Sequence, residues 1–542
     1  MESGSTSQDR RAPILFVLPL FVILSFVVFG PILRAEYAYD STYLIDRLKG
    51  PPPTTLADVV SPSRFGPTTG NLSWRPLNVL IMMLVDLRLF GANPALSASL
   101  NLVLHGINAF LLLVLLRRAR SQFANCDREG KAAARFAAPV ARFAPWVGAV
   151  LFLVHPLNSE AVLCTGFRAD LIAATCILAC ALLFVRWHEC RGRAGAACWR
   201  WLAGAAAVLA VGLLTKEVAV VALVQVPVLA LLALPARRRA IVDTGLGAAV
   251  LFVVFAAFLA AWRAFRFPDY PDVFLGGGGR FLGLVNMLVV FKEVYLAKVV
   301  WPWPLRVDYG FVPVAGVADP RVWTAAAAVL ALLLVVVLAA RREKLCAVGA
   351  IWYLVGFLPV SQIVPVPDPV AERFCYVPML GIALLAGGIA KALLATKAAS
   401  PRLLAAAGIL VAVVLAGVSF RRSFDWRDDV TLNIANWEEA GDRRPRALEA
   451  LGALYLVQAG RQTTRGDAPA ATRTVEKARS CLDELLRADP NHVAAHRLYA
   501  VWGVAIGRMD MAKAHIARAL ELAPDDPQVR DVARLCGVLP KT

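Results

Sequence analysis

The sequence lacks the spacings that mark common metal sites. Its ten cysteines form no CxxC pair and no Cys/His zinc spacing. Cys481 and Cys536 share a polar C-terminal region, whereas several others lie inside apolar runs, where we interpret them as packing residues: Cys164, Cys176, Cys180 and Cys375. We therefore assign no metal ligand and no cofactor from the sequence, without excluding a divalent metal.

The chain also has little charge for its length. Charged residues make up 18% of its 542 residues, and hydrophobic residues make up 58%. A water-soluble protein cannot bury so much apolar surface in one core. The first apolar run, 12–33, has no small-residue cleavage site after it, so we predict a retained span and not a signal peptide. These features exclude a soluble globular protein.

Apolar runs recur along the chain at roughly the length that a helix needs to cross a hydrocarbon core about 30 Å thick. Two further apolar segments, 76–90 and 283–301, are expected to lie on the outer face of the membrane or to dip into it. The fold class is therefore an all-α polytopic membrane protein. We predict about eleven crossings, at 12–33, 96–116, 143–157, 170–186, 201–215, 217–235, 243–265, 321–340, 345–363, 373–391 and 403–420.

Basic residues dominate the charge, which is +18 overall. They gather in short loops between the predicted spans, at 117–135, 186–193, 237–239, 341–344 and 391–402. The positive-inside rule accounts for such clusters as cytoplasmic, so we do not interpret them as a nucleic-acid surface. An odd number of spans then places the N-terminus in the cytoplasm and everything after residue 420 outside.

The composition becomes mixed and charged after the last predicted span. Pro490 and Pro524 lie about 34 residues apart, the period of tetratricopeptide repeats. A degenerate earlier unit covers 445–487. We predict a transmembrane domain at 1–420, a linker at 421–444 and a short repeat solenoid at 445–542, which either binds a protein segment or only caps the fold.

Several ionisable residues lie near the predicted outer ends of the spans. A charge at the bilayer centre costs about 2.5–3.5 kcal/mol, so such a group indicates a shared cavity. Each residue also has a structural interpretation: an ion pair between neighbours, a packing role for His105, or a solvated turn for Asp40. The members are His155, Glu160, Arg168, Asp170, Lys216, Glu217, Asp308, Glu372 and Arg373, with Asp40 and Arg75 in the first outer loop.

Carboxylates and cations together at a membrane surface suit an anionic lipid head that carries a transferable group. The cations hold its phosphate and stabilise the charge that develops on the leaving group. A carboxylate removes the proton of an attacking hydroxyl. The residues alone do not identify the transferred group.

A set of short motifs resembles the transmembrane and tetratricopeptide-repeat-containing O-mannosyltransferases in order and approximate spacing, over nearly the whole membrane region. The motifs are Tyr39-Asp40, Trp74-Arg75-Pro76-Leu77, the stretch HPLNSEAV at 155–162, Arg168-Ala169-Asp170-Leu171, Lys216-Glu217, Asp308-Tyr309, Ala371-Glu372-Arg373 and Tyr376-Val377-Pro378.

The resemblance implies a GT-C glycosyltransferase fold. It also implies transfer of mannose, with inversion, from a polyprenyl-phosphate donor to Ser or Thr of a protein that the repeats present on the outer or lumenal side. Asp40 matches the family's catalytic acid of the first loop; its second acid is replaced by Ser41, and Glu36 is the nearest other acid. Arg168, Lys216 and Arg373 are our candidates for the donor phosphate. The Ala/Arg-rich composition favours a bacterial inner membrane over the endoplasmic reticulum.

Three alternatives remain open. A transporter is disfavoured because corresponding halves show no pair of Gly/Pro-interrupted spans. A non-catalytic membrane scaffold that displays its repeats predicts that loss of Asp40 or Arg373 leaves function intact. An enzyme of the same kind that modifies a glycan or a lipid keeps the chemistry and changes the acceptor.

Overall fold

The computed structural model describes residues 16–48, 74–124, 143–191, 196–233, 240–265, 279–341, 343–363, 370–395, 400–440 and 445–540. Parts of the predicted basic clusters, including 128–135 and 237–239, lie outside these ranges. The described residues form helices and no strands. They divide into two compact units, the first made of 1–303 and 310–424 and the second of 304–309 and 425–542.

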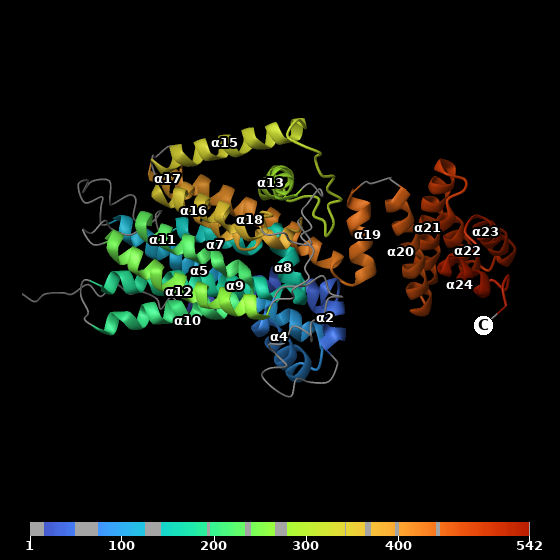
Figure 1. The fold of residues 1–542 in the computed structure, drawn as a ribbon, viewed down its shortest axis with the longest axis horizontal. Helices are drawn as coiled ribbons and strands as arrows, with labels where there is room; N and C mark the ends of the chain where they lie inside the picture. The colour runs from blue at the N-terminus through green and yellow to red at the C-terminus, as the bar shows by residue number, and fades with distance from the viewer. Residues whose placement is uncertain are drawn as a thin grey trace, which may run out of the picture. The chain divides into compact units, whose positions relative to one another are not determined.

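The first unit is a bundle of long apolar helices that lie side by side (Figure 1). Six helices are long and apolar enough to cross a membrane, or seven if the bent pair Ala144–Val154 and Pro156–Leu163 is one span. The chain is therefore a multi-pass membrane protein. The six are Val17–Arg34, Pro94–Ala119, Thr165–Cys190, Ala240–Ala264, Pro320–Leu338 and Arg402–Asp425.

Four shorter apolar helices coincide with the remaining predicted spans, so the count of crossings stays a prediction. They are Trp199–Thr215, Glu217–Leu232, Lys344–Val360 and Pro378–Leu394. The main helices of the bundle are α1 (Val17–Phe29), α5 (Pro94–Ala124), α7 (Ala144–Val154), α9 (Arg168–Cys190), α10 (Trp199–Thr215), α11 (Ala222–Ala233), α12 (Ala240–Phe265), α15 (Pro320–Ala340), α16 (Lys344–Gly356), α17 (Pro378–Ala395) and α18 (Pro401–Asp425).

Shorter helical pieces connect them. The two segments predicted to lie on the outer face are helical, and α13 is viewed end-on in Figure 1, across the direction of the bundle. Both segments contain a π-helix, η5 and η10. The pieces are η2 (Gly30–Arg34), α2 (Asp40–Leu48), α4 (Pro76–Ile81), η5 (Met82–Leu89), η6 (Pro156–Asn158), α8 (Ser159–Leu163), η7 (Thr165–Phe167), η8 (Ala196–Cys198), η9 (Glu217–Val221), α13 (Gly279–Val290), η10 (Phe291–Leu296), α14 (Ala297–Val300), η11 (Leu358–Val360) and η12 (Glu372–Cys375).

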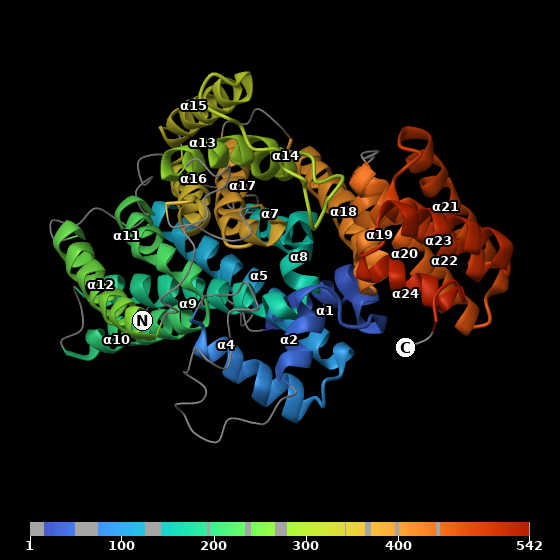
Figure 2. The same ribbon diagram turned by 45° about the vertical axis from the view of Figure 1, so that its right-hand side comes forward.

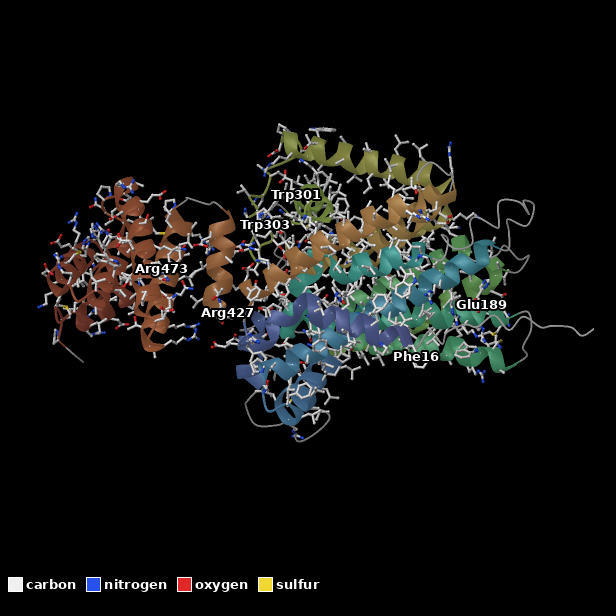
Figure 3. The ribbon with its side chains drawn as sticks, turned by 180° about the vertical axis from the view of Figure 1, so that it is seen from behind. Phe16, Glu189, Trp301, Trp303, Arg427 and Arg473 are labelled. Atoms are coloured by element: carbon white, nitrogen blue, oxygen red, sulfur yellow. The ribbon has the colours of Figure 1, made fainter. Side chains whose placement is uncertain are left out.

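Basic residues meet acidic partners at one end of the bundle. Arg118, near the C-terminal end of α5, lies 3.7 Å from Glu189 near the C-terminal end of α9. Lys391 of α17 pairs at 2.7 Å with Glu343, which precedes α16. Figure 3 shows Glu189 at this end and Trp303 near the other end. Each of these contacts joins two helix ends that lie next to predicted basic clusters.

Glycines let three helices approach at backbone distance. A Cβ atom added to Gly349 of α16 would lie 2.4 Å from the backbone nitrogen of Leu385, and one added to Gly381 of α17 would lie 2.3 Å from that of Tyr353. Gly148 of α7 likewise faces the carbonyl oxygen of Ala383 on α17 at 2.2 Å. Small residues at such crossings are the common device for helix packing in lipid. We name α7, α16 and α17 the glycine-packed block.

The second unit is also helical. Its helices pack through two apolar clusters, one centred on α20, α21 and α22 and the other on α22, α23 and α24. Val430 and Ile434 of α19, within the predicted linker 421–444, join the first cluster beside Leu448 and Leu451. The helices are α19 (Asp429–Ala440), α20 (Pro445–Thr464), α21 (Ala468–Ala488), α22 (Val493–Ala505), α23 (Met509–Leu522) and α24 (Pro527–Leu535).

Candidate functional site

The polar residues of the first unit gather where its helices break. Helix α7 ends at Val154 because Pro156, two residues later, cannot continue the hydrogen-bond ladder, and the chain bends there by 51°. Lys216, after α10, and Ala371, before η12, both have extended backbones. Each break begins a short helix that carries a charged side chain. The breaks lie at the opposite ends of α5, α9 and α17 from the basic residues.

Two buried ion pairs join segments that are distant in the sequence. The Arg373 side chain donates from Nη1 to Glu160 Oε1 at 2.7 Å, and its backbone N–H donates to Oε2 of the same carboxylate at 2.9 Å. Lys216 Nζ lies 2.6 Å from both carboxylate oxygens of Asp170. These contacts fix η12 to α8 and the end of α10 to the start of α9.

A third ion pair is more open to solvent. Arg75 donates from Nε to Glu217 Oε2 at 2.8 Å and from Nη2 to Oε1 at 2.5 Å, with 22% and 42% of the two side chains exposed. Burial lowers the pKa of Arg75, but the Glu217 carboxylate raises it above its ordinary value, and Asp170 adds to that rise. Arg75 therefore stays charged and belongs to the same electrostatic cluster as the Lys216 pair.

Asp40 is the first residue of α2, and the residues on both sides of it hold it in place. Tyr39, directly before it, has a φ of +57°, a conformation that a bulky residue adopts only where its surroundings enforce it. The next residue, Ser41, is buried and accepts a hydrogen bond from the backbone N–H of Gly166 at 3.0 Å. Its Oγ also lies 3.2 Å from Cys164 Sγ. The start of α2 is therefore fixed against η7.

Gly166 lies in close contact with the start of α2. A Cβ atom added there would lie 3.2 Å from Asp40 Cβ and 3.3 Å from the Asp40 carbonyl carbon. The adjacent Phe167 ring makes an edge contact with Tyr39, at 6.0 Å between centroids, and the Arg373 guanidinium lies 4.3 Å from its centre. Arg373 in turn experiences the charge of Asp40. One turn, η7, thus brings Asp40 and the Arg373 pair together.

Arg168 is enclosed by partners within the protein. Its side chain is fully buried and donates from Nε to Asn101 Oδ1 at 2.8 Å, from Nη2 to Asp86 Oδ1 at 2.9 Å, and from Nη1 to the other oxygen of Asp86. Nη2 also donates to the carbonyl oxygen of Ser97 at 2.9 Å. A guanidinium so enclosed is a structural ion pair that holds η5 against α9, and we leave it out of the phosphate site.

Asp86 itself was missed from the sequence. It lies in the apolar segment 76–90 and is fully buried, and Ser97 Oγ donates to it at 2.6 Å. The sequence did contain a signal for Asp86, because an ionisable residue within an apolar run is expected to have a functional or structural partner.

The remaining predicted residues have structural contacts or lie elsewhere. His155 Nδ1 accepts the N–H of Leu157, and its Nε2 lies 3.1 Å from the carbonyl oxygen of Val299. His105 contacts Tyr376 Oη and the carbonyl oxygen of Leu153. Glu372 is buried in η12, Glu36 is exposed before α2, and Asp308 belongs to the second unit, where its N–H donates to Asn436 Oδ1 at 3.0 Å.

The site therefore comprises Asp40 with three ion pairs from separate segments of the first unit. Within the described ranges, no three His, Cys, Asp or Glu side chains are grouped so that they could hold a metal ion. The chain matches no protein-family model, no curated protein and no solved structure.

Proposed function

We propose that the first unit is a membrane glycosyltransferase that moves a sugar from a polyprenyl-phosphate donor to a hydroxyl acceptor. The observation that supports this function best is the environment of Asp40. A half-buried carboxylate is fixed by a strained residue before it and a buried serine after it, next to three ion pairs at one end of the bundle. Such preorganisation is typical of catalytic groups.

In the proposed reaction Asp40 acts as general base. It takes the proton of the acceptor hydroxyl while that oxygen forms a bond to the anomeric carbon of the sugar, and the bond from that carbon to the phosphate oxygen breaks. The electron pair leaves with the polyprenyl phosphate. Arg75, Lys216 and Arg373 stabilise that charge, and their carboxylate partners Glu217, Asp170 and Glu160 orient them.

The motifs of the sequence supply the finer parts of the proposal: mannose as the sugar, Ser or Thr of a protein as acceptor, a GT-C fold with about eleven crossings, and a repeat domain that presents the acceptor. The antiparallel packing of α20 on α21 and of α22 on α23 agrees with a helix-pair repeat. We place the breaks, the site and the second unit outside a bacterial inner membrane. A reporter fused after Phe420 tests this: activity in the cytoplasm contradicts it.

The test of function is transfer of radiolabelled mannose from polyprenyl-phosphate-mannose to endogenous acceptors in membranes that contain the protein. We expect label in protein that β-elimination releases, since the sugar would be attached through Ser or Thr. Label in lipid or glycan keeps the enzyme and changes the acceptor. Absence of transfer from mannose and from other polyprenyl-phosphate sugars, with folded protein present, favours the scaffold.

Replacing Gly166 with valine is expected to lower kcat about tenfold or more and to change KM for the donor little. The added carbons push Asp40 away from η7, whereas the phosphate-binding cations keep their partners. The measurement is steady-state kinetics of sugar transfer.

Gly408→Val on α18 is the matched control, because a Cβ atom there meets nothing within 4 Å. Equal kinetics for the two valine variants would show that the contact between Gly166 and Asp40 does not position the base.

A further inference from the structure

Two histidines of the second unit face each other across a helix pair. His496 lies on α22 and His515 on α23, and their Nδ1 atoms are 3.0 Å apart. Both side chains are half-buried. Two imidazole nitrogens bound to one tetrahedral Zn²⁺ at 2.0–2.1 Å are about 3.3 Å apart. The two rings would therefore have to separate by only about 0.3 Å to share an ion.

The hydrogen bonds around the pair define its tautomers. His496 Nε2 lies 2.9 Å from the carbonyl oxygen of Pro490, which can only accept, so Nε2 carries the hydrogen and Nδ1 has the lone pair. His515 Nδ1 then donates to it in the metal-free protein. Histidine ligands of metals commonly donate their other ring N–H to a carbonyl in this way. His496 is thus already oriented as a ligand.

His515 is also held in place. Its ring stacks on Tyr499 at 4.5 Å between centroids and 9° between planes, and the Tyr499 hydroxyl donates to Asp483. The Asp483 carboxylate places a negative charge near the two histidines, which favours a bound cation. Arg479, whose Nε lies 3.6 Å from that carboxylate, partly offsets this charge.

We propose that His496 and His515 form a two-histidine binding site for a borderline divalent metal ion of the Zn²⁺, Ni²⁺ and Cu²⁺ class, completed by water. On binding, His515 moves its proton from Nδ1 to Nε2 through solvent, so that both Nδ1 lone pairs face the ion and both rings stay neutral. Imidazole suits these metals, and the usual order of affinity places Cu²⁺ first. The site would stabilise the second unit and is independent of the proposed transfer reaction.

Titration calorimetry of full-length, tag-free protein in detergent with ZnCl₂ and CuCl₂ tests the proposal. We expect one saturable site, with Cu²⁺ tighter than Zn²⁺, and affinity at least tenfold weaker in both His496→Gln and His515→Gln. His492→Asn is the matched control, since His492 caps α22 and asparagine keeps a capping oxygen. Wild-type protein without saturable binding, binding unchanged in both glutamine variants, or binding lost in the control would each overturn the proposal.

The pH dependence of metal binding to the wild-type protein is a second test, and it does not depend on whether the variants fold. Protons compete with a metal ion for the ring nitrogens of histidine, because only an unprotonated nitrogen is a ligand. We expect metal binding at least tenfold weaker at pH 5.5 than at pH 7.5. Equal affinity at the two pH values would contradict histidine ligation.

Discussion

Replacing Asp40 with asparagine is expected to reduce sugar transfer about 10²- to 10⁴-fold, the usual contribution of a general base. Asparagine has nearly the same shape and keeps the start of α2 in place, but it cannot accept the proton of the attacking hydroxyl. The loss should therefore fall on kcat, with the KM for the donor little changed, because Arg75, Lys216 and Arg373 still meet the phosphate. Single-turnover transfer from labelled donor measures it.

Asp319→Asn controls for the loss of one acidic residue in the same unit. Asp319 lies directly before α15, pairs with Arg321 of that helix, and is part of no contact of the site. If both variants transfer sugar at the wild-type rate, Asp40 is not the base. If Asp40→Asn instead raises KM and leaves kcat unchanged, the carboxylate binds substrate and does not move a proton.

The largest expected effect on stability is that of Asp86→Asn. Asp86 and Arg168 are both fully buried, and the substitution leaves a guanidinium without its compensating charge. Removing one partner of a buried pair costs about 3–5 kcal/mol. We expect a large fall in unfolding temperature in detergent and a loss of monodisperse protein, whereas Asp319→Asn behaves as wild type.

A double variant tests whether the balance of the two charges, and not the presence of these two particular side chains, determines the stability of the protein. Replacing Asp86 with leucine and Arg168 with methionine removes both charges and keeps similar volume, which is often neutral or stabilising for a buried pair. We expect this protein to recover most of the stability lost in Asp86→Asn. A double variant as unstable as the single one would show that Asn101 and Ser97, and not the charge balance, dominate the site.

Much of the membrane architecture could be predicted because hydropathy is a local property of the sequence. Every predicted span coincides with an apolar helix, and the helix breaks fall at His155-Pro156 and Lys216-Glu217, where proline and charge interrupt the apolar pattern. The number of crossings does not follow, because the helices next to these breaks are short. From the sequence we grouped Asp308 with the site, but residues 304–309 belong to the second unit. No local sequence pattern indicates that this segment packs with helices more than 100 residues later.

The pairing of charges could not be predicted for a different reason. Lys216 and Glu217 are adjacent, and the sequence suggested an ion pair between them. At the helix break their side chains instead reach Asp170 and Arg75, which are 46 and 142 residues away. Ser41 was interpreted as a missing acid, but its hydrogen bond with Gly166 makes it an anchor for Asp40. Such partners depend on tertiary packing.

If the first unit is the proposed transferase, the glycine-packed block limits where its lipid donor could enter. Its helices touch backbone to backbone, so no side chain there can swing aside to open a passage between α7, α16 and α17. Another side of the site is built from α2 and η5 (Figure 2). Met82 and Met83 of η5 pack there against Ile45 of α2, through flexible thioether side chains. A polyprenyl chain would therefore slide in from the bilayer past α2, and the methionines, not the glycines, would yield to it.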